Sequence, residues 1–201
     1  DLDLRRLGFY PAGGGEVSAL VQPAAGGLQP FDLTDRGAVQ EAYAECFAPA
    51  LPSSVAVREL AALAHALGWS VEKLRTPAVR QNEGPGNALL ATIAYAHVSE
   101  VVTCFGEKGV SAEQVAGALV KEVKAYQASE GALGQHLADQ WMLPLALAVV
   151  ERGGAASFTC TELTEHATTN IGVIERFLPV RFEVNSPGSC PHVRAMAAVN
   201  A

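Results

Sequence analysis

Two short stretches of the sequence hold side chains whose types and spacing suit chemistry on a phosphate group. The first runs from Gln135 to Gln140 at the start of a predicted helix, and it contains His136 and Asp139. These two residues are three positions apart, so they share one face of that helix. The second stretch, from Thr161 to Ile171, surrounds His166 with hydroxyl and amide side chains where a predicted strand gives way to a helix.

The position of His166 at a helix start indicates a phosphate-binding role. The first backbone N–H groups of a helix have no partner within it and carry a positive potential, which attracts an anion. An imidazole is largely neutral near pH 7 and can then act as a nucleophile. The residues alone leave a structural alternative open for each stretch. Asp139 and its neighbours can serve as helix caps, and His166 can be a hydrogen-bonded surface histidine.

The remaining histidines and the cysteines do not have the spacing of a metal site. We expect structural roles for the histidines outside the two stretches, which are His65, His97 and His192. The cysteines lack a C-x-x-C pair, so we predict reduced thiols and no metal ligands. They are Cys46, Cys104, Cys160 and Cys190. The triple glycine from Gly13 to Gly15 fits neither a dinucleotide-binding fingerprint nor a P-loop.

Composition limits the possible classes of protein. The chain has 201 residues, of which 49% are hydrophobic and 17% charged. This apolar content excludes disorder over most of the length and suits one moderate domain or two small ones. No apolar run reaches the roughly 20 residues of a membrane-spanning helix, and no signal-peptide core is visible, so we expect a cytoplasmic location. The net charge of −7 disfavours nonspecific coating of nucleic acid, although a few local cations can still hold it.

Hydrophobic periodicity predicts alternating strands and helices. In the first part of the chain we predict strands at Arg6–Tyr10 and Glu16–Gln22, joined by a glycine-rich loop that can form a hairpin. A connection rich in glycine and proline follows over Pro23–Pro30. We predict a helix over Asp35–Phe47, which Pro49 closes.

The pattern changes near residue 50. We predict a helix capped by Ser54 that runs through Leu67 and stops at Gly68. Strand-like segments follow at residues 71–80, 88–96 and 100–105, and Gly84–Asn87 is predicted to be a turn. Ser111 and Gln114 form a capping-box pattern ahead of a helix. One face of that helix is apolar and consists of Ala112, Val115, Leu119, Val123 and Tyr126.

The last part of the chain positions both chemical stretches. A helix with a polar start follows Gly134, and its remainder from Trp141 is apolar on all sides and is predicted to be buried. Gly153 and Gly154 end it. The further predicted elements are a strand at Ser157–Thr161, a helix at His166–Phe177 and a closing hairpin of Pro179–Val184 with His192–Val199.

Five stretches of the chain together resemble the RNA 3′-terminal phosphate cyclase family. They occur in family order and cover nearly the whole chain. They are Gly8–Gly15, Gly84–Asn87, Phe105–Glu113, His136–Gln140, and His166–Ile171 running into Glu175–Phe182. The last two are specific to the family, whereas each glycine loop alone is not.

The resemblance implies an ATP-dependent ligase that converts an RNA 3′-phosphate into a 2′,3′-cyclic phosphodiester. His166 matches the family histidine that takes AMP from ATP and passes it to the RNA 3′-phosphate, after which the neighbouring 2′-hydroxyl displaces AMP. The resemblance also implies Mg²⁺ or Mn²⁺ as the metal cofactor. Thr169 and Asn170 match positions beside the active histidine. The implied nucleotide-binding residues are His136, Leu137, Ala138, Asp139 and Gln140, with His136 at the position where an aromatic ring commonly stacks on adenine.

The family fold is α+β, with repeated β-α-β-α-β-β units in a large domain and a smaller inserted α/β domain. We therefore expect residues 1–50 and 129–201 to belong to the large domain and residues 51–128 to form the insert. Family members carry a long stretch ahead of the segment matched by Gly8, with most of the basic groups that hold RNA and triphosphate. We expect this chain to be the C-terminal portion of such a protein. Its expected partners are an RNA 3′-phosphate end, ATP and the missing N-terminal half.

Two other readings remain open from the sequence. One is a cyclase-like relative without catalysis that binds RNA or assists ribosome assembly, although relatives of that kind lose the active histidine. The other is an α+β domain whose polar helix starts are only caps. In that case loss of the Asp139 side chain would cost roughly 1 kcal/mol of stability and leave nucleotide binding unchanged.

Overall fold

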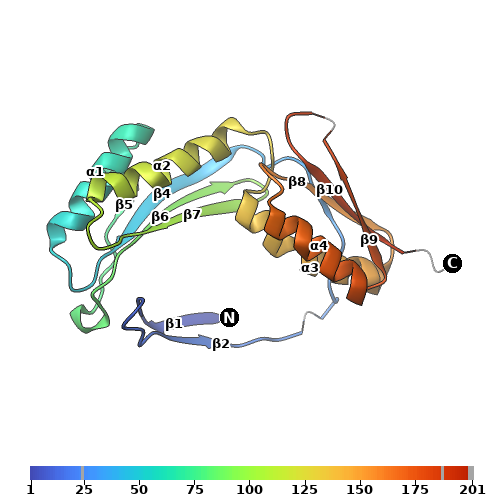
Figure 1. Ribbon diagram of the computed structural model, residues 1–201, viewed down its shortest axis with the longest axis horizontal. Helices are drawn as coiled ribbons and strands as arrows, with labels where there is room; N and C mark the ends of the chain where they lie inside the picture. The colour runs from blue at the N-terminus through green and yellow to red at the C-terminus, as the bar shows by residue number, and fades with distance from the viewer. Residues whose placement is uncertain (24, 187, 199–201) are drawn as a thin grey trace. The chain divides into compact units, whose positions relative to one another are not determined.

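The computed structural model describes residues 1–23, 25–186 and 188–198, and it has a mixed α and β architecture (Figure 1). The helices in this part of the chain are α1 (Ser53–Leu67), α2 (Ala112–Ala128), α3 (Gln135–Arg152) and α4 (Glu165–Phe177). The strands are β1 (Leu2–Arg6), β2 (Glu16–Ala19), β3 (Asp32–Leu33), β4 (Val39–Phe47), β5 (Leu74–Arg75), β6 (Ala88–Tyr95), β7 (Ser99–Phe105), β8 (Ala155–Thr159), β9 (Val180–Asn185) and β10 (His192–Ala197). Short 3₁₀ turns lie at Val71–Lys73 and Gln81–Glu83.

The chain divides into two compact units. The first comprises residues 1–22, 39–94 and 101–125, and the second comprises residues 23–38, 95–100 and 126–201. Each unit has its own four-stranded sheet. The domain boundaries at residues 50 and 128 that the resemblance implies stay a prediction.

The first unit is built on a sheet in the strand order β5-β4-β6-β7. Helices α1 and α2 cover one face of this sheet (Figure 1). The core side chains alternate along β6, where Leu89, Ala91 and Ile93 are fully buried, and they meet Leu63 of α1 and Leu119 of α2 in the same core. The unit also contains the antiparallel hairpin of β1 and β2.

The second unit carries a sheet in the order β3-β8-β10-β9. Strand β10 pairs antiparallel with both β8 and β9, and β3 runs parallel to β8. Helices α3 and α4 lie side by side against this sheet (Figure 1). Phe158, Val193 and Met142 are buried in the core of this unit, so the helices pack on the sheet through apolar side chains.

Several predicted elements are confirmed. The capping box at α2 forms, because the Ser111 N–H donates to Gln114 Oε1 at 2.9 Å and the Gln114 N–H donates to Ser111 Oγ at 3.3 Å. The predicted apolar face of α2 is buried. Gly68 ends α1 in the left-handed conformation with φ of 65°. The N-terminal hairpin and the closing hairpin form as well, although the predicted end at Val199 lies outside the described residues.

The helix predicted over Asp35–Phe47 is wrong. Residues Val39–Phe47 form β4, and burial alternates along its second half with Ala42, Ala44 and Cys46 in the core. Alanine and glutamate favour helices in isolation, but the pairing of β4 between β5 and β6 decides the outcome. The buried residues of this segment recur with the period of two that is typical of a strand.

Three smaller predictions are also corrected. Helix α1 begins two residues earlier than predicted and has Pro52 at its N-cap, so Ser54 does not cap it. Of the strand-like segment at residues 71–80, only β5 pairs, because Val71–Lys73 forms a 3₁₀ turn. The first strand of the N-terminal hairpin is predicted at Arg6–Tyr10, but the strand observed is β1, which ends at Arg6. The residues after Arg6 belong to the loop that joins β1 to β2.

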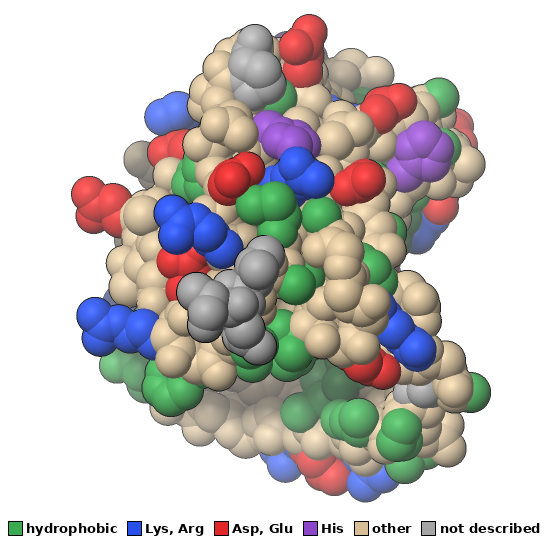
Figure 2. All heavy atoms as spheres, turned by 90° about the vertical axis from the view of Figure 1, so that its right-hand side faces the viewer, with side chains coloured by type: hydrophobic (Ala, Val, Ile, Leu, Met, Phe, Trp, Pro, Cys, Tyr) green, Lys and Arg blue, Asp and Glu red, His purple; other side chains and the backbone are tan. Residues whose placement is uncertain are grey.

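Helix α3 is not buried on all sides. Met142, Leu145 and Val149 face the core, whereas Leu143, Leu147 and Val150 are exposed. The expectation of complete burial was wrong because the sheet of this unit covers only one face of the helix. Figure 2 likewise shows hydrophobic side chains reaching the surface among charged groups.

The α+β class is therefore confirmed, while the repeated units and the inserted domain stay predictions. None of the helices in the described ranges is long and apolar enough to cross a membrane.

The four cysteines are free thiols with different burial. Burial raises the pKa of the Cys160 thiol to about 12. Burial, together with the adjacent Glu59 carboxylate, raises the pKa of the Cys46 thiol well above its ordinary range. Because the thiolate is the reactive form, we expect iodoacetamide at pH 8 to alkylate the half-buried Cys190 first.

Mass spectrometry of peptides from native and denatured samples measures this order. Cys46 and Cys160 should react only after denaturant unfolds the chain, and the half-buried Cys104 should fall between the two groups. Alkylation of Cys160 in the native protein as fast as that of Cys190 would contradict the burial described above.

Candidate active site

The start of α3 is fixed to the end of β8 by backbone hydrogen bonds. The Leu133 N–H donates to the Thr159 carbonyl at 3.0 Å, and the Thr161 N–H donates to the Leu133 carbonyl at 2.9 Å. This parallel bridge brings the segment before α3 alongside the segment that leads into α4. The two chemical stretches identified in the sequence therefore begin side by side.

A buried carboxylate accepts a hydrogen bond from the N-cap residue of α3. The Gly134 N–H, at the N-cap, donates to Glu100 Oε2 at 2.8 Å, and Glu100 is almost fully buried. A negative charge at a helix N-terminus is favourable because the free N–H groups there carry positive potential. A Cβ at residue 134 would lie 2.4 Å from Glu100 Oε1, so only glycine allows this approach.

Helix α4 begins with a side-chain cap. Thr164 is the N-cap, and its Oγ1 accepts a hydrogen bond from the Ala167 N–H at 3.1 Å. Glu165 and His166 follow as the first residues of the helix. Their backbone N–H groups belong to the first turn, which has no acceptors within the helix. The imidazole of His166 therefore stands at the positive end of α4.

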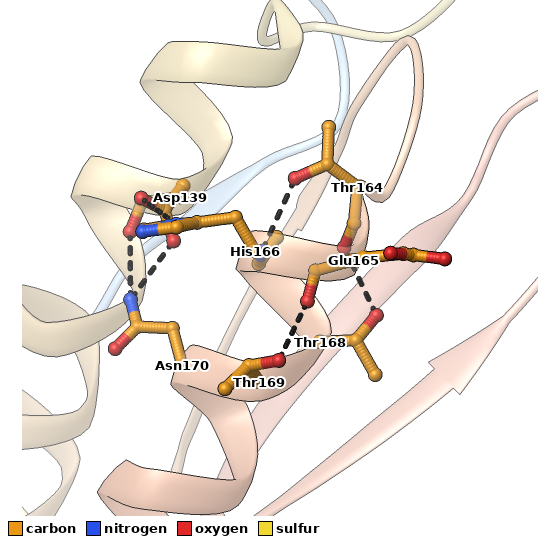
Figure 3. Close-up of polar contacts among 8 residues, drawn as sticks. Asp139, Thr164, Glu165, His166, Thr168, Thr169 and Asn170 are labelled. Carbon is orange, nitrogen blue, oxygen red and sulfur yellow. Dashed lines mark hydrogen bonds and ion pairs between the residues drawn. The ribbon is translucent and has the colours of Figure 1, made fainter.

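Asp139 connects the two helices. Its Oδ2 lies 3.1 Å from His166 Nδ1, and its Oδ1 accepts a hydrogen bond from Asn170 Nδ2 at 3.0 Å. Figure 3 shows His166 and Asn170 of α4 both directed at the Asp139 carboxylate of α3. One carboxylate thus holds two side chains from successive turns of the neighbouring helix.

The contact with Asp139 leaves the other ring nitrogen of His166 available. The His166 side chain is 82% exposed and that of Asp139 is 21% exposed. Because a carboxylate accepts hydrogen bonds, it favours the imidazole tautomer with the proton on Nδ1. The unshared electron pair is then on Nε2, at the exposed side of the ring. This is the arrangement that a nucleophilic imidazole requires.

The other predicted nucleotide-binding residues are distributed around the first turns of α3. His136 is exposed and lies within 3.5 Å of the Gln135 side chain, and it sits one helical turn before Asp139. Gln140 is exposed and Leu137 is half-buried. Ala138 is fully buried, so its methyl group belongs to the core.

Thr169 does not contact the Asp139 cluster. Its hydroxyl donates to the Glu165 carbonyl at 2.9 Å, and Thr168 makes the equivalent bond to Thr164 at 3.0 Å (Figure 3). Both hydroxyls are thus engaged with the backbone of their own helix. Of the two supporting residues predicted from the sequence, only Asn170 is joined to the aspartate by its side chain.

The contact between Asp139 and His166 is not predicted by the sequence. The spacing places Asp139 with His136 on one helix face, whereas the structure adds His166 from a different helix. The spacing of Asp139 and His166 carries no local pattern, because their contact depends on how α3 and α4 pack. The role of Thr164 as N-cap had a signal, since threonine before a helix start is a preferred cap.

The described residues do not include a group of three or more metal-ligating side chains. Asp139 is the carboxylate in contact with His166, and both of its oxygens already have partners. The donors present in the described residues therefore do not fit a complete Mg²⁺ site.

Comparisons with known proteins agree with the resemblance seen in the sequence. A sequence profile of the RNA 3′-terminal phosphate cyclase family matches residues 1–184. A protein named RNA 3′-terminal phosphate cyclase from Ralstonia nicotianae is 46% identical over 195 residues, which cover 96% of this chain and 54% of the relative. Proteins of the same name from Koribacter versatilis and Salmonella enteritidis are 41% and 43% identical, with 96% and 92% of this chain covered and 52% of each relative.

The chain spans about half the length of the curated relatives it matches. The family match nevertheless extends over most of its length and includes both helices of the Asp139 cluster. The chain belongs to the RNA 3′-terminal phosphate cyclase family.

Proposed function

We propose that this chain takes part in the ATP-dependent conversion of an RNA 3′-phosphate into a 2′,3′-cyclic phosphodiester, with His166 as the residue that carries AMP. The observation that carries the proposal is the contact between Asp139 Oδ2 and His166 Nδ1 at 3.1 Å, which leaves the exposed Nε2 as the nucleophile. Family membership supports the reaction class.

In the first step, His166 Nε2 attacks the α-phosphorus of ATP. A nitrogen–phosphorus bond forms, the bond from the α-phosphorus to the bridging oxygen breaks, and pyrophosphate leaves. The Asp139 carboxylate stabilises the positive charge that the ring gains. The N-terminus of α4 supplies N–H dipoles beside the phosphoryl oxygens, where negative charge increases.

In the second step, an oxygen of the RNA 3′-phosphate attacks the phosphorus of the adenylyl group and His166 leaves as the neutral ring. The activated RNA end then closes: its 2′-hydroxyl oxygen attacks the 3′-phosphorus, the bond from this phosphorus to the oxygen of AMP breaks so that AMP departs, and the hydroxyl proton passes to solvent. Each step exchanges one bond to phosphorus for another, so a difficult ring closure is divided into easier displacements. The chain's own contribution is to hold the imidazole in one orientation and one tautomer.

The remaining parts of the proposal concern binding. The segment His136–Gln140 would receive the nucleotide, with His136 stacking on adenine and Thr169 and Asn170 beside the active histidine. Mg²⁺ or Mn²⁺ would neutralise charge on the triphosphate, and its ligands would include groups outside the described residues. We further propose a cytoplasmic location and a partnership with the N-terminal half of the family fold.

The first prediction from the proposed function concerns His166. Incubation of the chain with radiolabelled ATP and Mg²⁺ should give an acid-labile protein–AMP adduct, because a phosphoryl group on imidazole nitrogen is lost in acid. His166→Ala should abolish the adduct. His65→Ala, which removes an exposed histidine from α1, should retain it. An adduct of undiminished yield in His166→Ala would exclude His166 as the carrier.

The second prediction concerns the tautomer of His166. In Asp139→Asn, an amide N–H can donate to Nδ1, so the ring proton moves to Nε2 and the nucleophilic pair is lost. We expect the rate of adduct formation to fall by about a hundredfold or more, measured by rapid quench with labelled ATP.

Glu165→Gln is the matched control, because it removes one carboxylate next to His166 that does not contact the ring. It should change the rate less than severalfold. Asp139→Asn should lower the thermal unfolding temperature by only a few degrees, which corresponds to roughly 1 kcal/mol of stability. Equal rates in the two variants would show that Asp139 acts only as a helix contact.

The third prediction concerns adenine stacking. His136→Ala should raise the ATP concentration for half-maximal adduct formation by about 5- to 100-fold, the range for loss of one base–aromatic stack. His136→Tyr presents a larger ring and should lower that concentration relative to the wild type. The maximal rate at saturating ATP should change little in both variants. If both variants behave as the wild type, adenine does not stack on this position.

A further inference from the structure

Arg36, in the segment between β3 and β4, is a buried cation that lies outside the His166 cluster. It is 9% exposed, and the other lysines and arginines of the described ranges are more accessible. Removing a guanidinium group from water is unfavourable, so the group is stable only where acceptors and ring faces replace the water. The groups that surround Arg36 therefore indicate which part of the fold it holds.

Arg36 holds the C-terminal end of α2. Its Nη1 donates to the Tyr126 carbonyl at 3.0 Å, and its Nη2 donates to the Ser129 carbonyl. The last carbonyls of a helix have no partner within it and carry negative potential, so a cation is favourable there. The guanidinium also lies over the ring of Tyr126, 4.3 Å from its centroid, and over that of Tyr95 at 5.4 Å. One planar group thus makes two hydrogen bonds and two ring contacts, a combination that a lysine does not reproduce.

The chain that leaves α2 at this point runs directly into the start of α3. Residues 129–134 form this α2–α3 connector. The Tyr126 hydroxyl donates to the Ala132 carbonyl at 2.9 Å, and the Ala132 N–H donates to Thr159 Oγ1 at 3.0 Å. The carbonyl groups that Arg36 holds therefore lie at the beginning of a short segment whose middle is fixed to β8 as well.

The connector determines where Asp139 lies. Gly134 is the N-cap of α3, and its N–H donates to Glu100. Asp139 is in the second turn of α3, so a shift or rotation of the first turn moves its carboxylate. The contact of Asp139 Oδ2 with His166 Nδ1 at 3.1 Å allows little movement before the hydrogen bond is lost. Arg36 at one end of the connector and Glu100 at the other thus act on the orientation of His166 from outside its cluster.

We propose that Arg36 is a positioning residue: by holding the end of α2 and the α2–α3 connector, it places Asp139 where it fixes the ring of His166. The consequence for the reaction rests on the proposed function, because it requires His166 to carry AMP. The placement of the ring is a property of the fold and is measurable without ATP. The alternative is that Arg36 only stabilises the second unit.

Nuclear magnetic resonance of the full chain labelled with ¹⁵N-histidine observes the ring directly. A long-range ¹H–¹⁵N spectrum at about pH 8.5, where an ordinary imidazole is neutral, distinguishes protonated from unprotonated ring nitrogens. The signals of His166 are those that disappear in His166→Ala. In the wild type Nδ1 should carry the proton, because it donates to Asp139. Arg36→Met has a side chain of similar length without charge or donors, and both ring nitrogens should then show averaged shifts because the two tautomers exchange.

The same substitution should slow formation of the AMP adduct. We expect the rate at saturating ATP to fall by about 10- to 100-fold in Arg36→Met, since a misplacement of about 1 Å far from the reacting atoms has an effect of this size. Rates are referred to the folded fraction, which thermal unfolding measures for each variant. Arg36→Lys keeps the charge and reaches one of the two carbonyls, so it should recover part of the rate and part of the signal of the fixed tautomer.

Two control variants separate positioning from stability. Arg75→Met removes an arginine that also lies over a tyrosine, 3.5 Å from the centroid of the Tyr43 ring, but belongs to the first unit. Val180→Ala removes buried methyl groups from β9, beyond the C-terminal end of α4, and should lower the unfolding temperature of the second unit. Both variants should keep the wild-type signals of His166 and the wild-type rate of adduct formation.

Tyr126→Phe provides the test if Arg36→Met does not fold. It removes the hydrogen bond to the Ala132 carbonyl and leaves the ring beside Arg36, so it should cause a smaller change in the same direction. Wild-type signals and a wild-type rate in Arg36→Met, or in Tyr126→Phe where Arg36→Met is unfolded, overturn the inference. Averaged signals in the wild type, or an equal loss in Val180→Ala, overturn it as well. If the wild type forms no adduct but Arg36→Met averages the His166 signals, the proposed function fails and the positioning role stands.

Discussion

The candidate site depends on one carboxylate that serves two helices. Asp139 belongs to α3, and both side chains that it holds, His166 and Asn170, belong to α4. The carboxylate accepts hydrogen bonds from both side chains, so it fixes the orientation of the imidazole and its tautomer at the same time. Without this contact His166 would be an exposed histidine with free rotation, and a nucleophile that rotates freely loses the advantage of orientation.

The rest of the second unit provides the precision that such a contact needs. A carboxylate meets an imidazole at 3.1 Å only if the two helix starts are placed correctly. The backbone bridge between Leu133 and the end of β8 fixes the start of α3, and the Thr164 cap fixes the start of α4. These anchors are a backbone bridge and a helix N-cap, whereas the imidazole that we propose as the nucleophile is exposed. Rigid elements thus carry a side chain that remains open to substrates.

Local patterns in the sequence predicted the parts of this arrangement but not their contact. The polar start of α3 and the helix that carries His166 were both visible from residue types and periodicity. The capping box of α2 and the glycine stop of α1 were visible for the same reason, because each depends on residues close in sequence.

The strand β4 was missed because its alanine and glutamate residues favour helix, and only pairing with β5 and β6 decides otherwise. The Asp139–His166 contact was missed since packing of two helices leaves no periodic trace. The resemblance to a known family supplied what periodicity lacked, since it marked His166 as special among the histidines.

The acidic balance of the chain constrains how it can meet RNA. With a net charge of −7, the chain repels a polyanion at long range. The RNA binding proposed above must then rely on short-range contacts in which each cation acts locally. The N–H groups at the start of α4 carry positive potential without any cationic side chain. Under the proposed function, the nucleotide would therefore be held through these dipoles and through the contacts of the His166 cluster.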